Sequence, residues 1–173
     1  TDLLETPLSG TWNLADGRYT GAAENDFRHH GQGCRIRGTA VDLFNLDVIP
    51  TSFVQISATL ATASQGGFVF DYKGPEDFKF VTLSVETKEL LLGHHTVKAG
   101  WVIDAALTNP SLDSTTDYTL GVTLRGTTVS VTLNDQAALS YAYNALVTDG
   151  GFGLLARNGR ASFDTVTLKT DDP

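Results

Sequence analysis

Residues 117–143 read DYTLGVTLRGTTVSVTLNDQAALSYAY, and residues 150–168 read GGFGLLARNGRASFDTVTL. In the first stretch, alternate positions are apolar on both sides of a turn predicted at Arg125-Gly126. These apolar positions are Tyr118, Leu120, Val122 and Leu124 before the turn and Val129, Val131 and Leu133 after it. Because alternate side chains of a strand point to opposite faces, this period predicts antiparallel strands that bury one face.

Strand-like segments fill most of the remaining chain. Asp16-Gly17 lies between two of them and predicts a hairpin over residues 11–22, because both positions of such a turn need positive φ. Further strands are predicted at 53–60, 68–73, 78–86, 90–95 and 101–107, with a turn at 64–67 and loops at 23–33 and 109–116. About a dozen strands on this spacing predict two packed sheets. The expected fold is an all-β, two-sheet antiparallel jelly-roll sandwich that forms a single domain over residues 1–173.

Composition limits the possible partners. The formal net charge of −8 and a pI near 4.7 argue against nucleic acid, which requires clustered Lys and Arg. No apolar run approaches the roughly 18 residues that a membrane span needs, so no membrane insertion is expected. Asp greatly outnumbers Glu, and the chain starts at Thr1 and contains no Met. We therefore expect a loop-rich extracellular protein that is part of a larger multidomain chain.

Five segments together resemble a known superfamily. They are TWNLADGRY (11–19), GFVFDYKGPEDFKFVTLSVETKELLLGHH (67–95), GWVIDA (100–105), VTLNDQAALSYAY (131–143) and GGFGLLARNGRASFDTVTL (150–168). This combination is similar to the laminin-G-like, concanavalin A-like β-sandwich modules of large bacterial secreted or surface proteins. The resemblance implies an extracellular or cell-surface location. The superfamily includes lectins, carbohydrate-binding modules, glycosidases and protein-binding domains, so the fold alone does not decide the function.

The resemblance also implies a calcium site. In several members, an Asp that follows an aromatic residue on the last strand binds calcium together with backbone carbonyls of the N-terminal segment. Asp164 follows Phe163 in this way, and Glu5 and Asn13 are the expected partners. The ordinary alternative is an exposed Asp on an edge strand whose alternation turns Phe163 inward.

Catalysis is not expected. Glycan-cleaving enzymes of this fold carry carboxylates at alternate positions on one strand, whereas Glu86 and Glu89 are three residues apart and would face opposite ways. Asp71 and Asp77 flank a Gly-Pro bend and remain a pair that the sequence leaves open, because the two carboxyls of a glycosidase must flank one bond.

Sugar recognition on a sandwich uses an aromatic ring with polar neighbours. The ligand-binding candidates are Asp71, Tyr72, Asp77, Lys79, His94, Trp101, Arg157 and Asn158. Trp101 could equally pack in the core. The histidine pairs at 29–30 and 94–95 are interpreted as rim residues, because neighbours on a strand face opposite ways and offer a metal at most one ligand per pair.

The leading hypothesis is a non-catalytic extracellular module that binds a glycan or cell-surface ligand and is stabilised by calcium. A structural or adhesion spacer is the second hypothesis, and a glycoside hydrolase of the same fold is the third.

Overall fold

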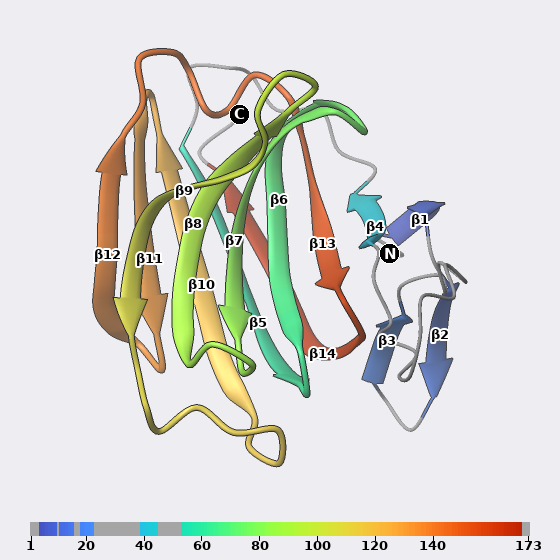
Figure 1. Ribbon diagram of the computed structural model, residues 1–173. Coiled ribbons are helices and arrows are strands. Elements are labelled where there is room, and N and C mark those ends of the chain that lie inside the picture. Colours follow the sequence, from blue (N-terminus) through green and yellow to red (C-terminus); the bar gives the residue numbers. More distant parts are fainter. Residues whose placement is uncertain (1–3, 10, 16–17, 23–38, 45–52, 171–173) are drawn as a thin grey trace.

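Two sheets packed face to face make up the molecule (Figure 1). The computed structural model describes residues 4–9, 11–15, 18–22, 39–44 and 53–170, and side chains from residue 18 onward within these ranges. None of these residues is helical, so the described chain holds no helix that could cross a membrane.

The two sheets, called A and B below, have seven strands each, and neighbours pair antiparallel. Sheet A runs in the order β1 (Leu4–Ser9), β4 (Thr39–Phe44), β13 (Gly151–Arg157), β6 (Gln65–Gly74), β7 (Asp77–Ser84), β8 (Glu89–Thr96) and β9 (Gly100–Thr108). Sheet B runs in the order β12 (Gln136–Ala142), β11 (Thr128–Leu133), β10 (Tyr118–Arg125), β5 (Val54–Thr62), β14 (Arg160–Thr170), β3 (Arg18–Ala22) and β2 (Thr11–Ala15). The predicted all-β, two-sheet antiparallel jelly-roll sandwich is confirmed.

Alternate side chains fill the space between the sheets, as the period in the sequence predicts. Sheet B buries Val54, Ile56, Ala58 and Leu60 on β5 and Tyr118, Leu120, Val122 and Leu124 on β10. Sheet A meets them with Phe68, Phe70, Val81, Leu83, Leu90 and Leu92. The strand predicted at 78–86 is β7, which lies inside sheet A and pairs with β6 on one side and β8 on the other.

The hairpin over residues 11–22 is confirmed by the pairing of β2 with β3, whereas two predicted turns are displaced. Arg125 pairs with Thr128, so the turn after β10 is Gly126-Thr127, with φ of 60° at Gly126. The turn predicted at 64–67 is wrong, since residues 65–67 already pair within β6. Gly67 instead allows β6 and β7 to lie close together, because a Cβ at this position would collide with the carbonyl oxygen of Val81.

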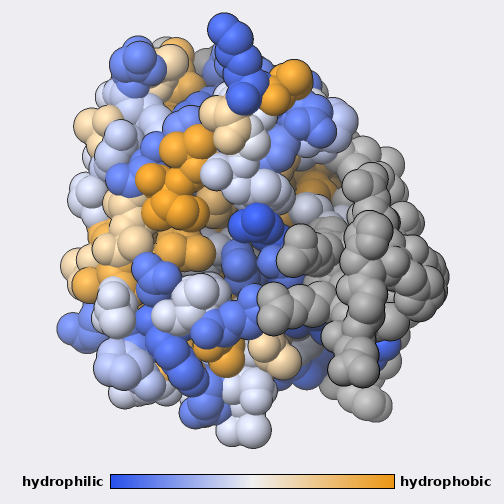
Figure 2. All heavy atoms as spheres, in the orientation of Figure 1, coloured by the Kyte–Doolittle hydropathy of each residue, from blue (hydrophilic) through white to orange (hydrophobic). Residues whose placement is uncertain are grey.

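The edge strands β9 and β12 lie on the same side of the sandwich (Figure 1). Figure 2 shows the outer face of sheet A, where apolar side chains gather over β8 and β9. Ile103 of β9, which pairs with Gly93 next to the outward-facing Phe80, is 45% exposed. Tyr143, which directly follows β12, closes this side by donating its hydroxyl to Asp104 of β9 at 2.7 Å.

β14 lies inside sheet B, between β5 and β3, and is not an edge strand. Its Phe163 is 1% exposed and packs in the core between the sheets, as alternation predicts. Directly after it, the pairing with β5 shifts between Asp164 and Thr167, and Thr165 adopts φ of 50°. Regular alternation up to the bulge turns the Asp164 carboxylate out to solvent while Phe163 stays inside.

Replacing Phe163 with alanine should lower the free energy of unfolding by about 3–5 kcal/mol, since the cavity left between two sheets cannot collapse. Urea denaturation followed by tryptophan fluorescence measures the change. The control is Val97→Ala, whose side chain is 80% exposed and should change stability by less than about 0.5 kcal/mol. A loss below about 1 kcal/mol for Phe163→Ala would contradict its place in the core.

Candidate functional site

The outer face of sheet A carries a second apolar cluster. On each strand its members alternate with the residues of the main core, so they lie on the side away from sheet B. The buried members are Val41, Val69, Phe78, Phe80, Leu91 and Leu155, and Leu43, Tyr72 and Trp101 pack against them. Sheet A is therefore apolar on both faces, and its outer face carries a group of aromatic rings.

The rings come from four strands and touch in a continuous stack. Phe78 of β7 lies between Tyr72 of β6, with ring centroids 5.4 Å apart, and His95 of β8, at 5.2 Å and nearly parallel. Trp101 of β9 stands across them, with its ring 4.9 Å from His95 and 5.0 Å from Phe80 in edge contacts. The stack exists because Phe78 pairs with His95 and His95 pairs with Trp101 across the sheet.

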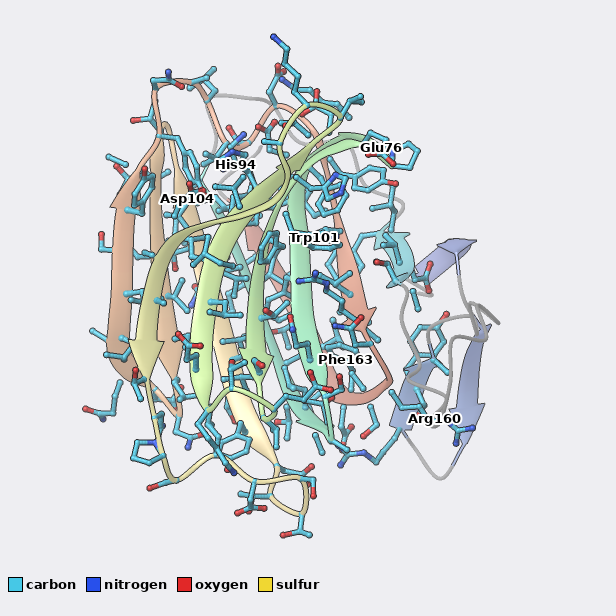
Figure 3. All side chains as sticks on the ribbon, in the orientation of Figure 1. Glu76, His94, Trp101, Asp104, Arg160 and Phe163 are labelled. Atoms are coloured by element: carbon cyan, nitrogen blue, oxygen red, sulfur yellow. The ribbon has the colours of Figure 1, made fainter. Side chains whose placement is uncertain are left out.

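A groove of about 490 Å³ runs along this stack. It is lined by Thr39, Val41, Tyr72, Pro75, Glu76, Phe78, His95 and Trp101. Polar groups stand at its rim: Glu76 is exposed in the β6–β7 turn, and its Oε2 lies 3.6 Å from Nδ1 of His95. Figure 3 shows Trp101 on the front of sheet A and Glu76 at the end of the β6–β7 hairpin. We call this hollow the outer-face groove.

A cation borders the outer-face groove. The guanidinium carbon of Arg157, on β13, lies 3.9 Å from the centroid of the Trp101 ring. Burial lowers the pKa of Arg157, while the charge of Glu86 opposes this shift. The stacking fixes a long, otherwise flexible side chain over an aromatic ring.

A second hollow, the end cleft, opens between the two sheets at one end of the sandwich and has a volume of about 450 Å³. Its polar side chains come from β7, β8 and β9 and from the residues that follow β12, and the main ones are Asp77, Lys79, His94, Asp104 and Tyr143. In Figure 3, His94 and Asp104 lie together beside β12, away from Trp101.

The polar groups of the end cleft bind one another. Asp104 Oδ2 accepts from the Tyr143 hydroxyl at 2.7 Å and lies 2.8 Å from Nδ1 of His94. Since an ionised carboxylate can only accept, Nδ1 carries the proton. Lys79 lies 5.1 Å from the centroid of the Tyr143 ring and donates to Asp71 Oδ2.

Asp71 is placed by a bulge in β6. Its φ is 46°, and the pairing of β6 with both neighbours shifts beside it. Phe70 and Asp71 consequently both turn away from the outer face, where Tyr72 follows. The Asp71 side chain is 2% exposed and forms ion pairs with Lys79 and, at 3.9 Å, with Lys73.

The eight ligand-binding candidates therefore fall into separate places. Tyr72, Trp101 and Arg157 come together at the outer-face groove. Asp77, Lys79 and His94 line the end cleft, and Asp71 is buried beneath Lys79. Asn158 lies in the β13–β14 turn with φ of 59°, and its carbonyl oxygen accepts from Ser64 Oγ at 3.0 Å.

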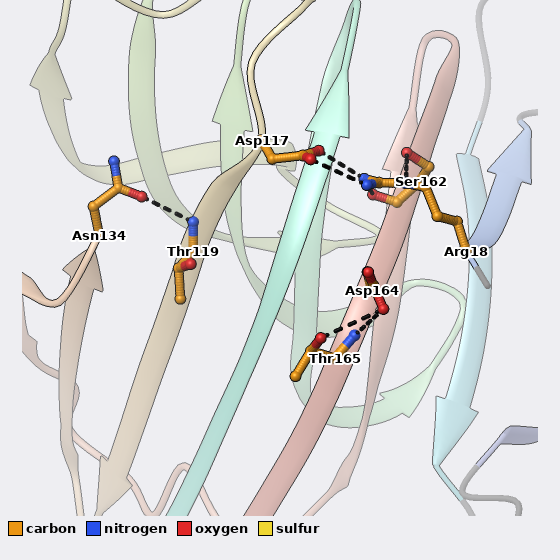
Figure 4. A network of polar contacts seen from close by, with 7 residues as sticks. All are labelled: Arg18, Asp117, Thr119, Asn134, Ser162, Asp164 and Thr165. Atoms are coloured by element: carbon orange, nitrogen blue, oxygen red, sulfur yellow. Dashed lines mark hydrogen bonds and ion pairs between the residues drawn. The ribbon is translucent and has the colours of Figure 1, made fainter. Parts of the chain in front are cut away.

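Of the three residues predicted to bind calcium, the structure describes the side chain of Asp164. Asp164 Oδ1 accepts from the backbone amide of Thr165 at 2.7 Å, and the nearby Arg18 bridges Asp117 and Ser162 (Figure 4). No three His, Cys, Asp or Glu side chains within the described part of the chain gather to hold a metal ion. The side chains of Glu5 and Asn13 lie outside it, as do His29 and His30 and the loop at 23–33. Calcium binding stays a prediction.

Sequence reasoning missed several residues of both hollows. Phe78, His95 and Glu76 of the groove were not ligand candidates, and neither were Asp104 and Tyr143 of the cleft. The parity of the aromatic residues was the available signal: Phe78 and Phe80 share a face of one strand and differ from Val81 and Leu83. An aromatic pair on the face opposite the core indicates a second apolar surface.

The fold is shared with proteins of known structure. The chain is similar to carbohydrate-binding module CBM66 from Bacillus subtilis, with 17% identity, a TM-score of 0.76, and 95% of this chain and 94% of that one covered. An alginate lyase of polysaccharide lyase family 7 matches at 12% identity and a TM-score of 0.60, covering 93% and 82%. A toad ovary galectin in complex with thio-digalactose matches at 8% and 0.54, covering 76% and 98%. No family model and no curated protein matches the sequence. At these identities the likeness establishes the β-sandwich fold that the chain shares with them.

Replacing Tyr143 with phenylalanine should protect the protein against alkali. Burial, and next the hydrogen bond to Asp104, raise the pKa of Tyr143 above its usual value. Above about pH 10 an unfolded tyrosine loses its proton while the folded one keeps it, so stability falls by up to about 1.4 kcal/mol per pH unit. Tyr143→Phe removes this loss, which urea denaturation at about pH 8 and about pH 11 measures.

Tyr72→Phe is the comparison for this experiment. The pKa of Tyr72 is raised by burial alone, so its removal should make the alkaline loss of stability less steep by a smaller amount. Equal slopes for the unmodified protein and Tyr143→Phe would contradict the environment described for Tyr143.

Proposed function

We propose that this protein is a non-catalytic module that binds a carbohydrate in the outer-face groove, in an extracellular or cell-surface setting. The observation that carries the proposal is the aromatic floor and wall of the groove, built from Tyr72, Phe78 and Trp101 with polar groups at the rim. Sugars present apolar C–H faces and hydroxyl edges, which match rings and rim groups respectively. The sandwich shared with a carbohydrate-binding module and a galectin supports the same function.

The outer-face groove suits a sugar better than the end cleft does. In the end cleft, Lys79 is paired with Asp71, and His94 and Tyr143 are both paired with Asp104. A ligand there would first have to break contacts that are already made, and each buried group left unpaired costs about 1–3 kcal/mol. A sugar that packs against the accessible parts of the rings in the outer-face groove need not separate a buried ion pair of this kind.

A glycosidase mechanism through Asp71 and Asp77 finds no support in the geometry. Asp71 is 2% exposed and held by Lys79, whereas Asp77 lies on the rim of the end cleft and is exposed. A carboxylate that is buried and ion-paired cannot approach a glycosidic bond. The placement of the pair thus favours binding over hydrolysis.

Trp101→Ala should weaken glycan binding by at least about tenfold, which is about 1.4 kcal/mol, because it removes one wall of the groove. Ligands are found on a broad glycan array, and the affinities of the unmodified protein and the variant are compared by titration calorimetry. Trp101→Phe keeps an apolar ring and should recover part of the affinity.

Phe53→Ala is the matched control, because Phe53 also packs beneath an arginine, with the Arg125 guanidinium 4.9 Å from its ring, but lies next to β5 in sheet B. It should leave glycan binding unchanged. Absence of binding to every glycan by a folded protein would refute the proposed function, and full affinity in Trp101→Ala would refute the site.

A further inference from the structure

Arg157 contacts Trp101 across three intervening strands of sheet A. β13 and β9 are separated in sheet A by β6, β7 and β8, so both side chains must lie along the outer face of the sheet for the guanidinium to stack at 3.9 Å. Gly67 of β6 lies beside Leu155 of β13 and offers no side chain that would stand in the way. Arg157 therefore places a cation on the outer face of sheet A, over the ring of Trp101.

No salt bridge within the described part of the chain pairs Arg157 with a carboxylate. Its guanidinium makes a cation–π contact with the Trp101 ring, and the charge of Glu86, which accepts from Ser64 Oγ at 3.0 Å, acts on it without such a pair. The Arg157 side chain is half-buried, so its charge has lost part of its hydration, and this burial lowers its pKa. An arginine stays charged nonetheless, because its ordinary pKa lies far above neutral pH. A half-buried charge with unused N–H donors gains more from an anion than a hydrated one does.

The guanidinium is also presented in a defined way. The Trp101 ring lies against the guanidinium, whose N–H donors are arranged in a rigid, planar fork. Such a fork of donors matches the two oxygens of a carboxylate. A lysine at the same position would offer only a compact charge without this geometry.

Building on the proposed glycan function, we propose that the outer-face groove selects a sugar that carries a carboxylate, a uronic acid, and that Arg157 is the residue that determines this specificity. The sugar ring packs on the rings of the groove while its carboxylate accepts from two parallel N–H donors of Arg157. The net charge of −8 and the exposed Glu76 oppose a densely charged polymer. The expected ligand therefore presents one carboxylate at the site.

The test compares uronic acid trimers of gluco, galacto and manno configuration with their methyl esters, by titration calorimetry. Each pair has the same shape and differs only in charge. At least one acid should bind at least about tenfold more tightly than its ester. A 6-sulfated galactose trimer and an oligoglutamate peptide test whether the carboxylate and the sugar ring are both needed, and both should bind more weakly than that acid.

Arg157→Gln should abolish the preference for the acid while changing the affinity for the ester by less than about threefold, and Arg157→Lys should restore only part of the preference. Arg125→Gln is the matched control, since it removes the other arginine that stacks on an aromatic ring, and it should leave the preference intact.

The outcomes separate the two proposals. Equal binding of acids and esters that still depends on Trp101 would overturn the choice of a uronic acid and leave glycan binding standing. A preference for the acid that survives Arg157→Gln, or tighter binding of the sulfated sugar or the peptide, would also overturn it. If neither these trimers nor any glycan on the array binds, the proposed function itself fails.

Discussion

Sheet A has to bury apolar side chains on both of its faces, and the remaining structure depends on this double burial. Val81 and Leu83 of β7 face sheet B, while Phe78 and Phe80 of the same strand face outward beneath Trp101. The aromatic groove therefore stands on side chains already packed by their neighbours. Rings that are held in place before a ligand arrives lose little conformational entropy on binding, which favours recognition on this face.

The sequence predicts the sandwich well wherever alternation is regular. The meander β10–β11–β12 and the hairpin β2–β3 follow from period-2 patterns and short turns. The prediction from sequence is wrong at residues 64–67, where the glycines suggested a turn. Gly67 instead lies within β6 and lets this strand approach β7 closely. A local pattern cannot distinguish the two, because the atom that a Cβ would strike belongs to another strand.

The candidate site was less predictable for a related reason. Tyr72, Trp101 and Arg157 could be chosen as residue types suited to sugars, and the fold brings them together. Phe78 and His95 join them through cross-strand register, which no single segment reveals. Lys79 and His94 were assigned to the same site, yet the alternation of β7 and β8 turns each of them to the other face of sheet A, where they line the end cleft.

The bulge at Asp71 gives β6 one residue more than β13 needs between Val69 and Tyr72. Without that residue, Phe70 would still face the core and Tyr72 would still lie over Phe78, so the groove does not require it. The buried carboxylate that anchors Lys79 is thus an insertion into an otherwise regular strand. The end cleft and the outer-face groove can therefore change independently during evolution. A related chain that lacks the residue at position 71 would lose the ion pair with Lys79 and keep the aromatic stack.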